Sequence, residues 1–120
     1  MRFCLKGETP IFTLCISYTI NPNKLADFRA YAEAEQDPIR RSGGKIVGYF
    51  LPTDFAGPTN IAYGLIDFLT LASYEQYRRA LAEDPDHKKN AAELERSGAI
   101  VALNRSIIER VGNDKAELTR

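Results

Sequence analysis

The chain has 120 residues, of which 44% are hydrophobic and 27% charged, and its 16 Lys and Arg balance its 16 Asp and Glu. This size and composition are typical of one globular domain with a single core, which excludes disordered and fibrous proteins. Nucleic-acid-binding surfaces need a basic excess or a basic stripe. Because the sequence has neither, we expect no nucleic-acid partner.

The cysteines and the apolar runs bear on the compartment and on cofactors. Cys4 and Cys15 are the only cysteines, and they form neither a C-x-x-C motif nor a cluster with histidine. The sequence therefore predicts no metal site, no redox motif and no cofactor. No stretch approaches the roughly 20 apolar residues of a membrane span, and the run Phe3-Cys4-Leu5 is too short for a signal peptide. We expect a cytoplasmic protein with no membrane partner.

The first part of the chain has the pattern of a strand followed by a helix. Residues 11–20 alternate between large apolar and small polar side chains, which predicts a strand. Asn21-Pro22 then supplies a helix cap and a proline suited to the first turn. Gly43-Gly44 ends the predicted helix, and Pro38 interrupts its last turns.

Two strands and a second helical region follow. Residues 45–51 and 60–69 are rich in apolar and aromatic side chains and are separated by a loop that contains Gly57-Pro58, which predicts an antiparallel hairpin. Ser73 and Gln76 have the spacing of a capping box for the next helix. Asp84-Pro85 repeats the cap-then-proline signal and predicts a further short helix over 85–97. Residues 103–111 are predicted as the last strand.

The element order is therefore strand, helix, strand, strand, helix pair, strand. This βαββαβ order predicts an α+β, ferredoxin-like sandwich, in which a four-stranded antiparallel sheet has its helices on one face. We expect this domain to span residues 11–111, with an N-terminal tail over 1–10 and a C-terminal tail over 112–120.

The second and third predicted strands carry apolar residues on both faces. In the second strand, Val47, Tyr49 and Leu51 are expected opposite Ile46 and Phe50. If helices cover only one face of the sheet, something else must cover the other face. A second copy of the chain would do so, which predicts a homodimer. The alternative is that short strands carry mixed residues that stay partly exposed.

Several short motifs follow one another in a fixed order along residues 13–111. They are Tyr18-Thr19-Ile20-Asn21-Pro22 with Lys24-Leu25, Pro38-Ile39 before Gly43-Gly44, Ile46-Val47-Gly48-Tyr49-Phe50, Asn60, and Ala80-Leu81-Ala82 before Asp84-Pro85. In order and spacing they resemble the NIPSNAP family. The resemblance implies a dimeric α+β barrel.

The sequence departs from the family pattern at positions that bear on a pocket. Family members commonly carry an acidic residue and an arginine where this chain has Leu14 and Ile16. They often carry a histidine and a tryptophan where it has Gly64 and Ile66, and a tryptophan where it has His87. The resemblance therefore implies the fold, but a different pocket in this chain.

His87 is the only histidine and the first candidate for chemistry. It follows the predicted helix start at Asp84-Pro85, and a neutral imidazole there could accept a proton or ligate haem iron. The alternative is an exposed histidine on the helix surface, between Asp86 and Lys88.

A second set of candidates lies on the predicted strands. Tyr18, Tyr49 and Tyr63 could hydrogen-bond a small polar ligand while their rings exclude water, or they could be core aromatics. Asp67 and Arg105 are charged residues within strands, and they could pair across the sheet or polarise a ligand.

Two functions fit these features. The first is a homodimeric small-molecule-binding or structural protein whose ligand would be hydrophobic or aromatic. The candidate ligand-binding residues are Tyr18, Tyr49, Tyr63, His87 and Arg105. The second is an enzyme similar to the cofactor-free monooxygenases and haem-degrading proteins that share the dimeric barrel, a hypothesis that depends on fold analogy alone.

Overall fold

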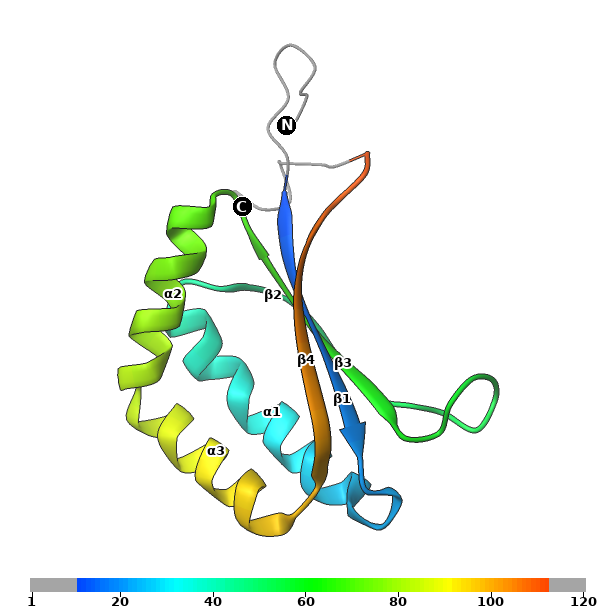
Figure 1. The fold of residues 1–120 in the computed structure, drawn as a ribbon. Helices are drawn as coiled ribbons and strands as arrows, with labels where there is room; N and C mark the ends of the chain where they lie inside the picture. The colour runs from blue at the N-terminus through cyan, green and yellow to red at the C-terminus, as the bar shows by residue number, and fades with distance from the viewer. Residues whose placement is uncertain (1–10, 113–120) are drawn as a thin grey trace.

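A four-stranded antiparallel sheet with three α-helices on one face forms the computed structural model, which describes residues 11–112 (Figure 1). The strands are β1 (Phe12–Ile20), β2 (Lys45–Phe50), β3 (Ile61–Phe68) and β4 (Ile100–Glu109), and the helices are α1 (Leu25–Arg41), α2 (Leu71–Glu83) and α3 (Pro85–Ser97), with a short 3-10 turn η1 (Pro22–Lys24) before α1. The predicted α+β order is confirmed. The expected tails and Cys4 lie outside the described residues, except for position 112.

The sheet order is β2-β3-β1-β4, so β1 and β3 are the inner strands. In the register, Ile16 of β1 lies between Gly64 of β3 and Arg105 of β4. Because side chains alternate along a strand, these three positions share one face of the sheet. The buried residues Leu14, Ile16 and Tyr18 place that face toward the helices, as the alternation predicted.

A bulge in β2 changes which of its side chains meet the helices. The register shifts between Ile46 and Gly48, so that Ile46 pairs with Ile66 and Tyr49 pairs with Gly64, both on the helix-covered face. Phe50 lies on the opposite face, paired with Tyr63. The sequence predicted Tyr49 and Ile46 on opposite faces of the sheet, and this prediction was wrong. One extra residue in a strand reverses which face the following side chains point to.

Local hydrogen bonds fix the ends of the helices. The Asn21 side chain caps η1, which leads into α1, and α1 continues through Pro38. The predicted capping box at Ser73 and Gln76 was wrong: Thr70 is the cap residue and Ser73 occupies the third helical position, so α2 begins earlier. Asp84 caps α3 as predicted, and Gly98 ends it with a φ of 73°, which favours glycine.

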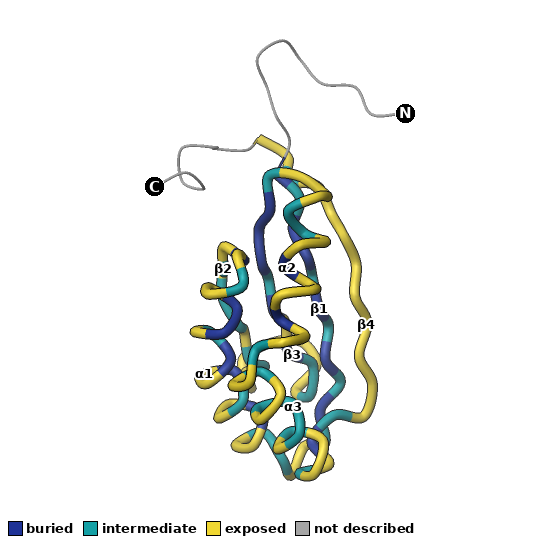
Figure 2. Tube along the Cα trace, turned by 90° about the vertical axis from the view of Figure 1, so that its left-hand side faces the viewer, coloured by how far each residue is buried: buried dark blue, intermediate teal, exposed yellow. Residues whose placement is uncertain are grey.

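The last strand also begins earlier than predicted, at Ile100, and it ends at Glu109. Figure 2 shows that nearly all of β4 is exposed, whereas β1 and β3 are largely buried. The reason is that α1, α2 and α3 cover the sheet on the side of β1, β2 and β3 and leave β4 as an open edge. No helix within residues 11–112 is long and apolar enough to cross a membrane.

Candidate functional site

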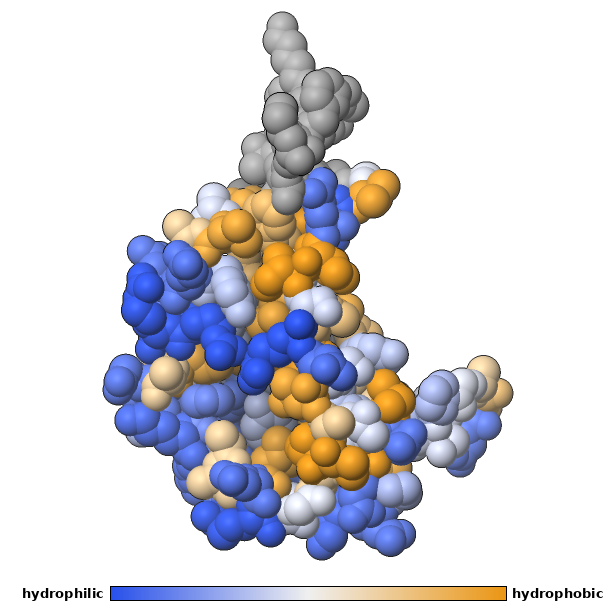
Figure 3. All heavy atoms as spheres, viewed as in Figure 1, coloured by the Kyte–Doolittle hydropathy of each residue, from blue (hydrophilic) through white to orange (hydrophobic). Residues whose placement is uncertain are grey.

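A cavity of about 420 Å³ lies between the helices and the sheet. Its walls come from β1, β2, β4 and all three α-helices, and its apolar lining includes Leu14, Ile16, Ile39, Leu81, Leu94 and Leu103. Figure 3 shows a band of hydrophobic residues down the side on which β4 lies, flanked by the hydrophilic outer faces of the helices. The cavity size falls within the range of small-molecule sites.

An aromatic cluster forms one end of this cavity. The ring of Tyr18 lies 4.8 Å from Phe28 and 6.3 Å from Tyr49, and the rings of Tyr31 and Tyr49 are 6.1 Å apart. Gly64 makes room for Tyr49, since a Cβ atom at this position would lie 2.9 Å from the Tyr49 ring. The side chains of Tyr18, Tyr31 and Tyr49, from β1, α1 and β2, thus lie together at one end of the cavity.

Burial changes the acid–base properties of these tyrosines. It raises the pKa of Tyr18, Tyr31 and Tyr49, because a tyrosinate would lose its hydration in this environment. Tyr77 of α2 also lines the cavity, and burial raises its pKa in the same way. All four hydroxyls therefore remain protonated at neutral pH and can donate hydrogen bonds.

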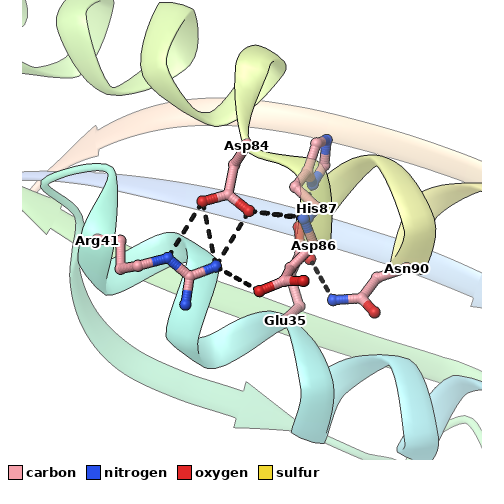
Figure 4. Close-up of polar contacts among 6 residues, drawn as sticks. All are labelled: Glu35, Arg41, Asp84, Asp86, His87 and Asn90. Carbon is pink, nitrogen blue, oxygen red and sulfur yellow. Dashed lines mark hydrogen bonds and ion pairs between the residues drawn. The ribbon is translucent and has the colours of Figure 1, made fainter.

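A buried carboxylate, Glu35, lies on the helix side of the cavity with an exposed fraction of only 1%. It contacts Nδ1 of His87 and accepts a hydrogen bond from Nδ2 of Asn90 at 3.1 Å (Figure 4). It accepts another hydrogen bond from the Tyr31 hydroxyl at 3.4 Å. Polar partners from α1 and α3 offset the cost of burying this charge. His87 therefore points inward, which contradicts the alternative of a surface histidine.

Glu35 is a site residue that the sequence reasoning missed. It lies on the buried face of α1 with Phe28, Ala32 and Ile39, at helical offsets of seven, three and four residues. The sequence did contain a signal for it, because Glu35 occupies a position where the helical period predicts an apolar residue.

The α2–α3 corner holds His87 in place. The Arg41 guanidinium forms ion pairs with Asp84 at 3.1 Å and with Asp86 at 2.8 Å. Asp84 also accepts a hydrogen bond from the backbone N–H of His87 (Figure 4). The hydrogen bond from Arg41 lowers the pKa of Asp84. A network from the end of α1 thus fixes the first turn of α3.

Two arginines add positive charge to the cavity walls. Arg105 of β4 and Arg78 of α2 both line the cavity, and neither forms a hydrogen bond or ion pair within residues 11–112. The predicted pairing of Arg105 with Asp67 was wrong: Asp67 lies on the other face of the sheet, where it accepts from Thr13 at 2.6 Å and from Arg110 at 2.5 Å. Arg105 is left available for an anionic ligand.

The structure brings four of the five candidate residues together. Tyr18, Tyr49, His87 and Arg105 line the same cavity. Tyr63 does not, because it lies on the opposite face of β3 and is 44% exposed. The described residues contain no group of three or more His, Cys, Asp or Glu side chains that could hold a metal ion.

Comparisons with known proteins give the family of this chain. The NIPSNAP family model matches residues 13–112. Similar solved structures include a NIPSNAP family protein of unknown function from Agrobacterium tumefaciens, with a TM-score of 0.75, 19% identity, and coverage of 87% of this chain and 91% of that one. Another is an uncharacterised NIPSNAP-like domain protein from Burkholderia xenovorans, with a TM-score of 0.73, 22% identity, and coverage of 89% and 90%.

A more distant structural match is a candidate antibiotic biosynthesis monooxygenase from Caulobacter crescentus, with a TM-score of 0.62, 11% identity, and coverage of 86% and 92%. At this identity the likeness shows the fold alone. No curated protein matches the sequence. Since the family model spans most of the sequence and the structure has the fold of solved members, this chain belongs to the NIPSNAP family.

Proposed function

We propose that this protein is a homodimer that binds a small amphipathic molecule, with an apolar or aromatic body and one anionic group, in the cavity between helices and sheet. The observation that carries the proposal is the composition of the cavity wall. Aliphatic and aromatic side chains line a space of about 420 Å³, and two arginines that form no hydrogen bond or ion pair with the described residues, Arg78 and Arg105, lie on that wall.

Each part of the wall would bind a different part of the ligand. Burying an apolar body gives about 25 cal/mol for each Å² removed from water. A guanidinium binds a carboxylate, phenolate or sulfonate by charge-assisted hydrogen bonds. The protonated hydroxyls of Tyr18, Tyr49 and Tyr77 can donate to neutral oxygens of the same ligand, while that of Tyr31 already donates to Glu35. The cavity thus suits molecules that combine these groups.

The uncovered face of the sheet supports the homodimer. Phe50 and Tyr63 are cross-strand neighbours on this face and are 46% and 44% exposed, and Ile108 of β4 is 48% exposed. Apolar side chains gathered on a sheet face are typical of an interface. A second copy of the chain would bury them in a symmetric contact of the same face with itself.

Ligand binding is tested with 1-anilinonaphthalene-8-sulfonate, a dye that has an aromatic body and one sulfonate and fluoresces in apolar sites. We expect saturable binding at one site per chain, and roughly tenfold weaker binding by Arg105→Gln, which loses one charge-assisted contact. Arg79→Gln is the matched control, because Arg79 is exposed on α2 and does not line the cavity. No saturable binding, or equal weakening by both variants, would contradict the proposal.

The position of the dye is tested with a second pair of variants. Ala82 and Ala80 are both exposed on α2, but only Ala82 lines the cavity. We expect Ala82→Trp to obstruct the cavity and reduce binding, and Ala80→Trp to bind like the wild type. If the two variants bind equally well, the dye occupies another surface.

The homodimer is tested by sedimentation equilibrium. A mass of about twice 13.4 kDa is expected for the wild type. Phe50→Lys places a charge on the uncovered face and should shift the mass toward that of one chain, while Lys89→Gln on α3 should leave it unchanged. A wild-type protein that stays monomeric at tens of micromolar would refute the dimer.

The enzyme alternative, a cofactor-free monooxygenase or haem-degrading activity, has support only from the shared fold. No observation on the cavity favours oxygenation over binding.

A further inference from the structure

We propose that His87, positioned by Glu35, is a general base that faces the cavity, so that the protein abstracts a proton from an acidic C–H group of the molecule bound there. This inference depends on the proposed binding function, since the same cavity must hold the substrate. It adds a reaction class, proton transfer, and assigns His87 as the catalytic residue and Glu35 as a positioning residue.

The first argument is the set of partners around Glu35. A carboxylate that is 1% exposed needs donors, and Asn90 and Tyr31 each provide one. The third contact comes from Nδ1 of His87. An ionised carboxylate only accepts hydrogen bonds, so Nδ1 carries the shared proton when Glu35 is ionised. In a neutral imidazole, Nε2 is then the atom with the free lone pair.

The second argument is the position of that lone pair. The His87 side chain lines the cavity and is 24% exposed. No residue in the described part of the chain hydrogen-bonds Nε2. Glu35 holds the ring at Nδ1, and Asp84 holds the backbone of the same residue by accepting its N–H. An oriented imidazole whose outer nitrogen is free is the arrangement of a general base.

The third argument is the charge on the remaining walls. Proton abstraction leaves an electron pair on the substrate, and Arg105 of β4 and Arg78 of α2 lie on the cavity walls where they can stabilise this negative charge. Glu95 of α3 and the tyrosines Tyr31 and Tyr77 are the other titratable groups that line the cavity beside His87 and Glu35 on the helix side.

The step balances without a further reactant. A substrate C–H bond breaks, an Nε2–H bond forms on His87, and the electron pair of the C–H bond stays on the substrate as a delocalised anion. The imidazolium then returns the proton to the same atom or to another one, which exchanges or isomerises the substrate. No electron acceptor is required.

The tautomer of His87 gives a direct test. Because the chain has one histidine, ¹⁵N-labelled protein yields a single pair of imidazole nitrogen signals, recorded at a pH where the ring is neutral. We expect the Nδ1–H tautomer in the wild type. We also expect a shift toward the Nε2–H form, which free imidazole side chains favour, in Glu35→Leu. Should that variant not fold, Glu35→Asp withdraws the carboxylate and serves instead. An Nε2–H tautomer in the wild type overturns the proposal.

The catalytic step is tested with 5-nitrobenzisoxazole, an aromatic probe for general bases. Removal of its C3 proton breaks the ring N–O bond and releases a coloured cyanonitrophenolate, whose charge Arg105 can bind. We expect the wild type to react about 100-fold faster than His87→Gln. Lys89→Gln, on the solvent side of the same helix, should match the wild type. Equal rates for the wild type and His87→Gln overturn the proposal.

The two proposals fail in different ways. If the probe displaces the naphthalene sulfonate dye but His87→Gln reacts as fast as the wild type, the general base is refuted and the binding function stands. If the dye does not bind in the cavity at all, the binding function is refuted and the general base falls with it.

Discussion

The two faces of the sheet differ in what covers their apolar side chains. On the helix-covered face, Phe28 and Leu14 are fully or almost fully buried within one chain. On the other face, Phe50 and Tyr63 remain nearly half exposed although they pair with each other across the strands. The core of one chain is therefore complete on one face only.

The faces also differ in their polar groups. The helix-covered face holds a cavity in which Glu35 is hydrogen-bonded to its neighbours, while Arg105 pairs with no residue in 11–112. On the other face, Asp67 is bound to Thr13 and Arg110. Bonded polar pairs are typical of structural roles, whereas unpaired charges beside a cavity are typical of binding sites. This contrast places the candidate site on the helix-covered face.

The largest expected effect comes from truncating the core of the covered face. Phe28→Ala should lower the free energy of unfolding by about 3–5 kcal/mol, because it removes a buried ring and leaves a space that the aromatic cluster cannot fill. Chemical denaturation at several protein concentrations measures this. The loss should be the same at all of them, since the contacts of Phe28 lie within one chain.

Phe50→Ala is the counterpart on the uncovered face. Its effect should grow with protein concentration, because it weakens association more than folding. If both variants lose the same stability at every concentration, the two faces do not differ as described.

A smaller effect is expected where Tyr49 lies over Gly64. Gly64→Ala should cost about 1–3 kcal/mol, since the new methyl group would meet the Tyr49 ring at 2.9 Å and displace it. In a Tyr49→Ala background the same change should cost much less. A double-mutant cycle by denaturation measures the coupling, and a coupling near zero would show that the ring is not held there.

Alkaline pH should lower the stability of the folded protein through the tyrosines of the helix-covered face. The pKa values of Tyr18, Tyr31, Tyr49 and Tyr77 are raised in the folded state from the ordinary value of 10.0. Above pH 10 the unfolded chain releases these protons and the folded chain retains them, so stability should fall as the pH rises from about 10 toward the folded-state values. Denaturation series at increasing pH measure the slope. Tyr77→Phe should make it shallower, and an unchanged slope would contradict the assignment.

The smallest effect is expected at the surface corner between α2 and α3. The hydrogen bond from Arg41 lowers the pKa of Asp84 below its ordinary value of 3.8. Its contribution to stability is therefore present above pH 3.8 and is lost as the pH falls through the lowered folded-state value. Asp84→Asn keeps a capping oxygen but removes this charge, so its stability should depend less on pH below about 4. Acid titration followed by circular dichroism compares the two proteins.

Much of the fold could be predicted from local patterns. The alternation in β1, the Asn21-Pro22 start before α1 and the Asp84-Pro85 start of α3 each depend on neighbouring residues, and each was found in the structure. The bulge in β2 was not predicted, because an extra residue is visible only when β2 is aligned with β3. The cap at Thr70 was missed because Ser73 completes its capping box, whereas Glu or Gln is the usual residue at that position.

The candidate site was harder to predict because its residues come from six elements. Tyr18, Tyr49, His87 and Arg105 were candidates by residue type, but their meeting in one cavity depends on how α3 packs against α1 and how far the helices cover β4. Glu35 was missed because a single buried carboxylate does not disturb an otherwise apolar helical face.

By itself, the sequence determined the order of the elements and the alternation of β1, because these follow from periodicities of two and of 3.6 residues. Only the tertiary structure decided that His87 points inward to Glu35 and that Tyr63 lies apart from the tyrosines of the cavity. It also decided that Asp67 pairs with Arg110, whereas Arg105 has no hydrogen bond or ion pair among the described residues. The physical reason is that a polar side chain finds its partner through space, across residues that are 43 to 55 positions apart in the chain.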